Sequence, residues 1–91
     1  MKVTVEIPKP MFQVGDAFVT EYSNVATIVA PAMLEVADKT KFGRVVEVSF
    51  EYYYSVQIAM GERVSTYYLD EEHISTTWRI IEPKEEKEYE V

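Results

Sequence analysis

Residues 46–60 read VEVSFEYYYSVQIAM, and the fold class follows from this stretch. Its even-numbered positions are apolar or aromatic, whereas its odd-numbered positions are mostly polar. Side chains alternate between the two faces of a β-strand, so the pattern predicts a half-buried sheet with one wet face. β-branched and aromatic residues favour the same conformation. The apolar set comprises Val46, Val48, Phe50, Tyr52, Tyr54, Val56, Ile58 and Met60.

This stretch is longer than a typical strand of ~5–6 residues. We therefore predict either two strands joined near residues 51–53 or one continuous, strongly bent strand. In the first case the loop needs an odd number of residues, because a two-residue loop would move the apolar set to odd positions. Gly61-Glu62 predicts a two-residue type II′ turn into a returning strand at 63–69.

Shorter elements are expected on both sides of this stretch. Pro31 opens the one helix-like segment, residues 32–37, because proline suits a first helical turn and Ala, Met, Leu and Glu favour helix. A short helical turn is predicted at 70–73. Further strands are predicted at 3–7, 17–22, 25–29 and 74–81. The sequence therefore predicts an all-β domain of five to six short strands.

Length and charge restrict the class of protein. The 91 residues suffice for one domain, which we place at residues 1–83, followed by a mobile, charged tail at 84–91. Lys and Arg total 9 against 16 Asp and Glu, and the net charge of −7 disfavours general nucleic-acid binding. No apolar run approaches the ~20 residues of a membrane helix, and no targeting motif is visible. We expect a soluble, cytoplasmic protein.

Three motifs together resemble a known family. They are Phe12-Gln13-Val14-Gly15-Asp16 before a strand, Gly43-Arg44-Val45-Val46-Glu47-Val48 at the start of the long strand, and residues 67–74 before the last strand. Their order resembles the SH3-like small β-barrel, in particular the KOW-type and phage or bacterial accessory variety. The resemblance covers residues 12–80. The segment 23–42 is longer than the corresponding loop, and the basic residues with which KOW-type domains contact RNA are mostly missing.

Catalytic and metal chemistry find little support in the residue types. There is no Cys and only one His, which excludes thiolate sites and two-histidine metal sites. Residues 70–73, Asp-Glu-Glu-His, could hold a divalent cation, or they form an exposed acidic turn, which we favour. No nucleophile motif and no glycine-rich phosphate loop is present. We predict a non-enzymatic protein without metal or cofactor.

The candidate site consists of tyrosines on the wet face and their acidic neighbours. Tyr53 lies among polar residues, and strand alternation turns either Tyr67 or Tyr68 outward. Exposed tyrosines anchor many protein interfaces, and SH3-like domains use such residues to bind extended peptides. Glu47 and Glu51 would form the acidic rim. The alternative is that these tyrosines pair across strands and support the sheet.

Three functions stay open at this point. The first is a protein-interaction module, for example an accessory protein of a phage or mobile-element system. The second is a KOW-like nucleic-acid-binding barrel with a local basic patch, formed by Lys39, Lys41, Arg44 and Arg63. The third is a structural homo-oligomer that pairs its open strand edges. The acidic surface could steer a basic protein or mimic nucleic acid, or it could serve solubility alone.

Overall fold

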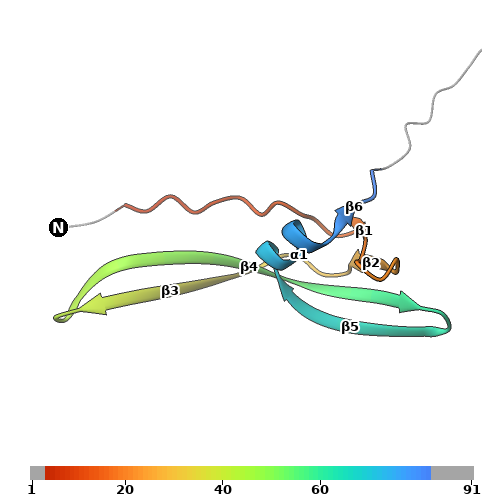
Figure 1. The fold of residues 1–91 in the computed structure, drawn as a ribbon. Helices are drawn as coiled ribbons and strands as arrows, with labels where there is room; N and C mark the ends of the chain where they lie inside the picture. Colours follow the sequence, from red (N-terminus) through yellow and green to blue (C-terminus); the bar gives the residue numbers. More distant parts are fainter. Residues whose placement is uncertain (1–3, 83–91) are drawn as a thin grey trace, which may run out of the picture.

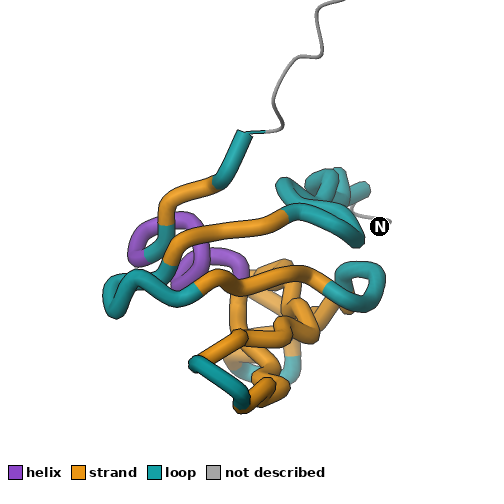
Figure 2. The backbone as a smooth tube through the Cα atoms, turned by 90° about the vertical axis from the view of Figure 1, so that its right-hand side faces the viewer, coloured by secondary structure: helices purple, strands orange, loops and turns teal. Residues whose placement is uncertain are grey.

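The computed structural model describes residues 4–82, and it shows a curled antiparallel sheet of six strands with one short helix (Figure 1). The all-β prediction is confirmed. In the end-on view of Figure 2 the strands curl partway round, as in half of a small barrel. The elements are β1 (Ala17–Val19), β2 (Val25–Ile28), β3 (Met33–Lys41), β4 (Arg44–Met60), β5 (Arg63–Asp70), α1 (Glu71–Thr77) and β6 (Arg79–Ile80). The predicted tail at 84–91 lies outside the described residues.

The spine of the molecule is β4, a single strand of 17 residues. The continuous bent strand is therefore the correct alternative, and the prediction of two joined strands is wrong. Tyr53 pairs with Met33 of β3 on one side and with Asp70 of β5 on the other. β2 pairs with residues 56–59 on the side opposite β5. Thus β2 and β3 follow one another along one side of β4, while β5 covers only its C-terminal half.

The core lies where β1, β2 and the C-terminal half of β4 meet the helix. The even-numbered residues from 52 to 58 of β4 face this core, as the alternation predicts. The aromatic rings pack edge to face, with 5.0 Å between the ring centroids of Phe12 and Phe18. The helix closes the core because Asp70 caps its N-terminus and Ile74 is fully buried. The buried apolar residues are Phe18, Ala26, Ile28, Tyr54, Val56, Ile74 and Trp78.

Three predicted elements are wrong. Residues 32–37 are not helical; Met33–Lys41 is a strand, because nine residue pairs along β4 outweigh the propensity of a helix of under two turns. Residues 74–77 are helical rather than extended, and only Arg79–Ile80 pairs as a strand. The cap at Asp70 and the burial of Ile74 account for this. Residues 4–7 of the predicted first strand pair with no other described strand.

Two tight turns end the long hairpins. Phe42 and Gly43 connect β3 to β4 with φ values of 55° and 72°, the two positive values of a type I′ turn. Gly61 has a φ of 62°, whereas Glu62 is not among the residues with positive φ. That combination agrees with the predicted type II′ turn. Glycine is favoured at both turns because L side chains rarely adopt these angles.

The chain is far more extended than its length requires. Its radius of gyration is 18.1 Å, against about 12 Å for a compact domain of this size. The excess comes from the arm, which we define as β3, the Phe42-Gly43 turn and residues 44–52 of β4 (Figure 1). No residue from 33 to 53 is fully buried. No helix in the described part of the chain is long and apolar enough to cross a membrane.

We predict that the outer half of the arm is dispensable for folding. A variant that lacks residues 38–41 and 44–48, in which the Phe42-Gly43 turn connects Ala37 to Ser49, should unfold in urea with nearly the native free energy, because no core residue is removed. Ile28→Ala should cost about 2–5 kcal/mol, since Ile28 is 1% exposed. An arm-shortened protein that fails to fold would show that the arm supports the core.

Candidate functional site

The predicted site residues meet at the base of the arm, where β3, β4 and β5 run side by side. Tyr53 and Tyr68 are diagonal neighbours on the wet face, and their ring centroids lie 5.2 Å apart. Tyr53 is half-buried, and Tyr68 is 51% exposed. We call this group, together with the carboxylates of Glu35, Glu51 and Asp70, the tyrosine surface. The planes of the two rings are tilted by 57° to one another.

The tyrosine surface is acidic. The hydroxyl of Tyr53 donates a hydrogen bond to the carboxylate of Glu51 at 3.3 Å. Partial burial and then the negative charges of Glu51 and Glu35 raise the pKa of Tyr53 above its ordinary value. Glu35 lies directly opposite Glu51 in the ladder, so two carboxylates share one row of the sheet. Chemically, this arrangement suits a cationic side chain from a partner.

Two of the predicted site residues lie elsewhere. Glu47 is four residues further along β4, opposite Lys39 on the arm. Tyr67 points to the other face of β5, because it pairs with Val56 of the core-facing set. The structure therefore brings Tyr53, Tyr68 and Glu51 together and separates Glu47 and Tyr67 from them. The cross-strand contact of Tyr53 with Tyr68 also fits the alternative in which these rings support the sheet.

Tyr67 belongs to a shallow groove between β5, α1 and the turn after β1. The groove has a volume of about 260 Å³ and a mostly apolar lining. Trp78 forms its floor and donates a hydrogen bond from Nε1 to Glu21 at 3.0 Å. The ring of His73 packs against the Trp78 ring, with 5.9 Å between the centroids. The sole histidine of the sequence is thus in contact with the indole ring that lines this groove.

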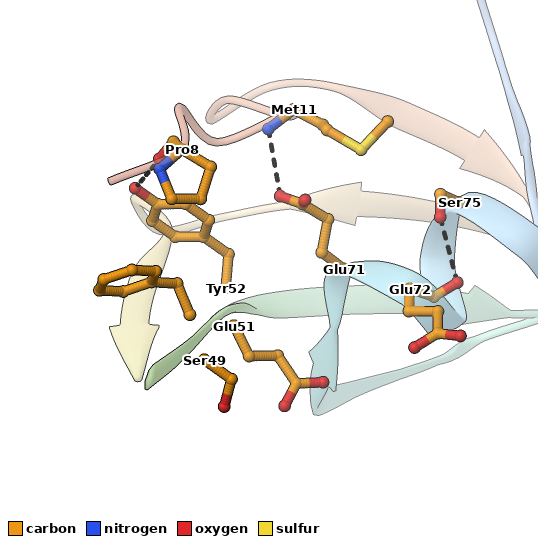
Figure 3. A pocket seen from close by; sticks show the side chains of 9 residues that line it. Pro8, Met11, Ser49, Glu51, Tyr52, Glu71, Glu72 and Ser75 are labelled. Carbon is orange, nitrogen blue, oxygen red and sulfur yellow. Dashed lines mark hydrogen bonds between the residues drawn. The ribbon is translucent and has the colours of Figure 1, made fainter. Parts of the chain in front are cut away.

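The chain before β1 crosses one face of the sheet as an extended strap, residues 4–12, above a cavity of about 480 Å³ (Figure 3). The hydroxyl of Tyr52 donates to the carbonyl oxygen of Pro8 at 2.7 Å. Glu71 fixes the other end, because its carboxylate accepts hydrogen bonds from the Tyr54 hydroxyl at 2.6 Å and the Met11 N–H at 3.1 Å. In Figure 3 the side chains of Ser49 and Glu51 point away from the strap.

These contacts give the acidic turn at 70–73 a structural explanation. The carboxylate of Asp70 accepts the His73 N–H as a helix cap, and Glu71 anchors the strap. Within residues 4–82, no three His, Asp or Glu side chains converge as metal ligands. No sequence pattern indicates the role of Glu71, because its partners Tyr54 and Met11 are 17 and 60 residues away.

The basic residues gather at the far end of the arm. Lys39, Lys41 and Arg44 flank the turn, and Phe42 at the turn is 95% exposed. The ammonium of Lys41 lies 6.0 Å from the centroid of the Phe42 ring. Arg63 pairs with Met60 at the opposite end of β4. The four-residue basic patch expected from the sequence is therefore wrong in one member, since only three of its residues share one location.

We predict that Tyr54→Phe destabilises the protein by about 1–3 kcal/mol at pH 7, measured by urea unfolding. The change removes the hydrogen bond to Glu71 and leaves the Phe12 N–H, 3.3 Å from the hydroxyl, without an acceptor. Tyr52→Phe is the matched control. It removes a hydroxyl from a half-buried ring, so it should cost less. Equal losses for the two variants would contradict the role assigned to the Glu71 contact.

The same variant should also change the response to alkaline pH. Burial and the hydrogen bond to Glu71 raise the pKa of Tyr54 well above 10, its value in the unfolded chain. Above pH 10 the unfolded state therefore loses a proton that the folded state keeps, and stability falls. The wild type should lose about 1 kcal/mol more than Tyr54→Phe between pH 9 and pH 11. Parallel pH profiles would exclude this linkage.

Comparison with protein-family models, with curated proteins and with solved structures finds no match to this chain. At the level of architecture, the curled sheet with a short helix before its last strand is compatible with a small barrel.

Proposed function

We propose that this chain is a non-enzymatic protein-interaction module that binds its partner through the arm and the adjoining tyrosine surface. The observation that supports this proposal most directly is the open state of both backbone edges of the arm. β3 pairs only with β4 among the described strands, and residues 44–52 of β4 pair only with β3. Unpaired N–H and C=O groups along an edge are a ready template for another strand.

The energetics of the arm favour a partner. An isolated two-stranded hairpin is at best marginally stable in water. The apolar face of this arm also stays largely exposed beneath the strap, since Val36 is 55% and Val46 is 57% exposed. Burying such side chains yields roughly 25 cal/mol for each Å² of apolar surface removed from water. A partner that covers the arm would therefore gain hydrogen bonds and apolar contacts together.

The charge distribution favours a protein over a nucleic acid. The chain carries a net charge of −7, and the tyrosine surface at the base of the arm adds three neighbouring carboxylates. Phosphates would be repelled there. Lys39, Lys41 and Arg44 place positive charge at the tip of the arm. A protein partner can instead present cations to the base and carboxylates to the tip.

The SH3-like barrel and the accessory role in a phage or mobile-element system belong to this proposal as well. The small curled sheet and the helical turn before the last strand support the barrel. The arm is the main departure from the family pattern, since residues 33–41 of the segment that is longer than the family's loop form one of its two strands. A projecting hairpin of this kind suits a part of an assembly.

The arm-shortened variant tests the proposal. Tagged wild-type protein should retain a defined partner from the source cells at stoichiometric level, and the arm-shortened variant should lose at least nine-tenths of it. Tyr68→Ala should weaken the same capture, because it removes half of the aromatic pair. Tyr22→Ala is the matched control, since Tyr22 is 78% exposed and lies in the turn between β1 and β2.

Equal capture by the wild type and the arm-shortened variant would overturn the proposal. Loss of capture with Tyr22→Ala but not with Tyr68→Ala would move the binding site to the groove beside Trp78, which Tyr22 also lines. Thermal unfolding of each variant, recorded in parallel, separates lost binding from lost folding.

A further inference from the structure

We propose that the partner of the arm is a second copy of this chain, and that the two β3 strands pair edge to edge, antiparallel, around a two-fold axis at Ala37. The inference rests on the proposed function and names the partner and the register. The argument starts from charge. The arm carries like charges in directly opposed positions at both of its ends, and each end is the complement of the other.

At the base of the arm Glu35 lies opposite Glu51, and at the tip Lys41 lies opposite Arg44. Like charges directly opposite one another destabilise a sheet. The two ends cannot neutralise each other within one chain. Lys41 lies six positions after Glu35, roughly 20 Å along the strand, whereas the screening length at physiological salt is about 8 Å. A second arm laid antiparallel brings the tip of each copy to the base of the other.

The register follows from the sequence of β3. In an antiparallel pair of identical strands related by a two-fold axis, directly opposed residues share a face of the sheet. One residue therefore lies at the axis, directly opposite the same residue of the second copy. With Ala37 on the axis, Glu35 of each copy lies opposite the second copy's Lys39, and this ion pair occurs twice. Moving the axis to Asp38 would pair Glu35 with Lys41 instead, but it would also place the Asp38 carboxylate opposite itself. Moving the axis to Val36 would lose both ion pairs. Charge complementarity therefore selects Ala37.

The same register brings the basic tip to the tyrosine surface. Lys41 comes to lie opposite the second copy's Met33, and Met33 is the ladder partner of Tyr53. The cations of the tip thus approach the carboxylates of Glu51, Glu35 and Asp70 that surround Tyr53. On the other face, Val36 lies opposite the second copy's Asp38. The two Val36 side chains are diagonal neighbours there, so the exposed apolar strips of the two arms meet at the axis.

The free edge of β4 is less suited to this pairing. The ladder skips Val46, so a bulge interrupts β4 near its N-terminus, while β3 pairs without interruption from Met33 to Lys41. Bulges are one of the devices by which proteins protect an edge from pairing. β3 is therefore the regular edge, with nine residues available to a second copy.

Charge reversal tests the register. Sedimentation equilibrium of the full chain at several concentrations should show a dimer. Lys39→Glu and Glu35→Lys should each raise its dissociation constant at least tenfold, because each places like charges opposite one another across the axis. The double variant should restore the dissociation constant to within about threefold of the wild type. Arg63→Glu has the same charge change as Lys39→Glu but lies away from the arm, and it should have no effect.

A cysteine provides a second test that does not depend on charge. The chain has no Cys, so Ala37→Cys introduces a single thiol, which the two-fold axis places beside its own copy at a Cα separation of about 5 Å. Mild oxidation should link this variant into a covalent dimer at micromolar concentration. Ser49→Cys is the control. Ser49 pairs with Ala37 on the same face, but the two copies would lie three strand spacings apart, about 14 Å, and should not link.

A wild type that stays monomeric at all concentrations would overturn the second copy as partner. Arm-dependent capture of a different protein would then leave the proposed function standing. A dimer that survives Lys39→Glu and links equally through Ser49→Cys would overturn the register. If the arm-shortened variant self-associates and captures partners as the wild type does, both proposals are overturned.

Discussion

The structure depends on one constraint, which is the pairing of a 17-residue strand whose neighbours on each side are shorter than itself. β2 and β3 together follow one side of β4, but β5 covers only residues 53–60 on the other. Backbone hydrogen bonds within the sheet are therefore complete only around the C-terminal half of β4. The core forms there, against β1 and α1. The N-terminal half, paired with β3 alone, projects as the arm.

The alternation along β4 could be predicted from the sequence because it depends only on local side-chain chemistry. The buried positions of Tyr54 and Val56 follow from it. The Gly61-Glu62 turn is equally local, because it depends on a glycine at the first turn position. The identity of β3 could not be predicted in this way. Residues 32–37 have helical propensity, and only the presence of a long unpaired edge on β4 makes them a strand. Long-range pairing outweighed a local preference that was worth little over so few residues.

The candidate site was predictable in part. Strand parity placed Tyr53 on the wet face and required Tyr67 and Tyr68 to point to opposite faces, but it gave no information on which of the two joins Tyr53. That depended on the register of β5 against β4, which sets Tyr68 diagonal to Tyr53. The role of Glu71 could not be predicted from the sequence, because it also depends on long-range contacts. Its role arises from contacts with Met11 and Tyr54, and nothing in the spacing of these residues indicates them.

The two interpretations of Tyr53 and Tyr68, as support of the sheet and as a binding surface, are compatible. A ring pair that packs across β4 and β5 stiffens the sheet at the base of the arm, and a stiff base fixes the direction in which the arm projects. The same rings, surrounded by carboxylates, form a surface complementary to the cations of the arm's own tip. Because tip and base lie roughly 20 Å apart along one extended hairpin, they cannot meet within one chain. The separation that makes the arm unfavourable in isolation is therefore what makes it complementary to another arm.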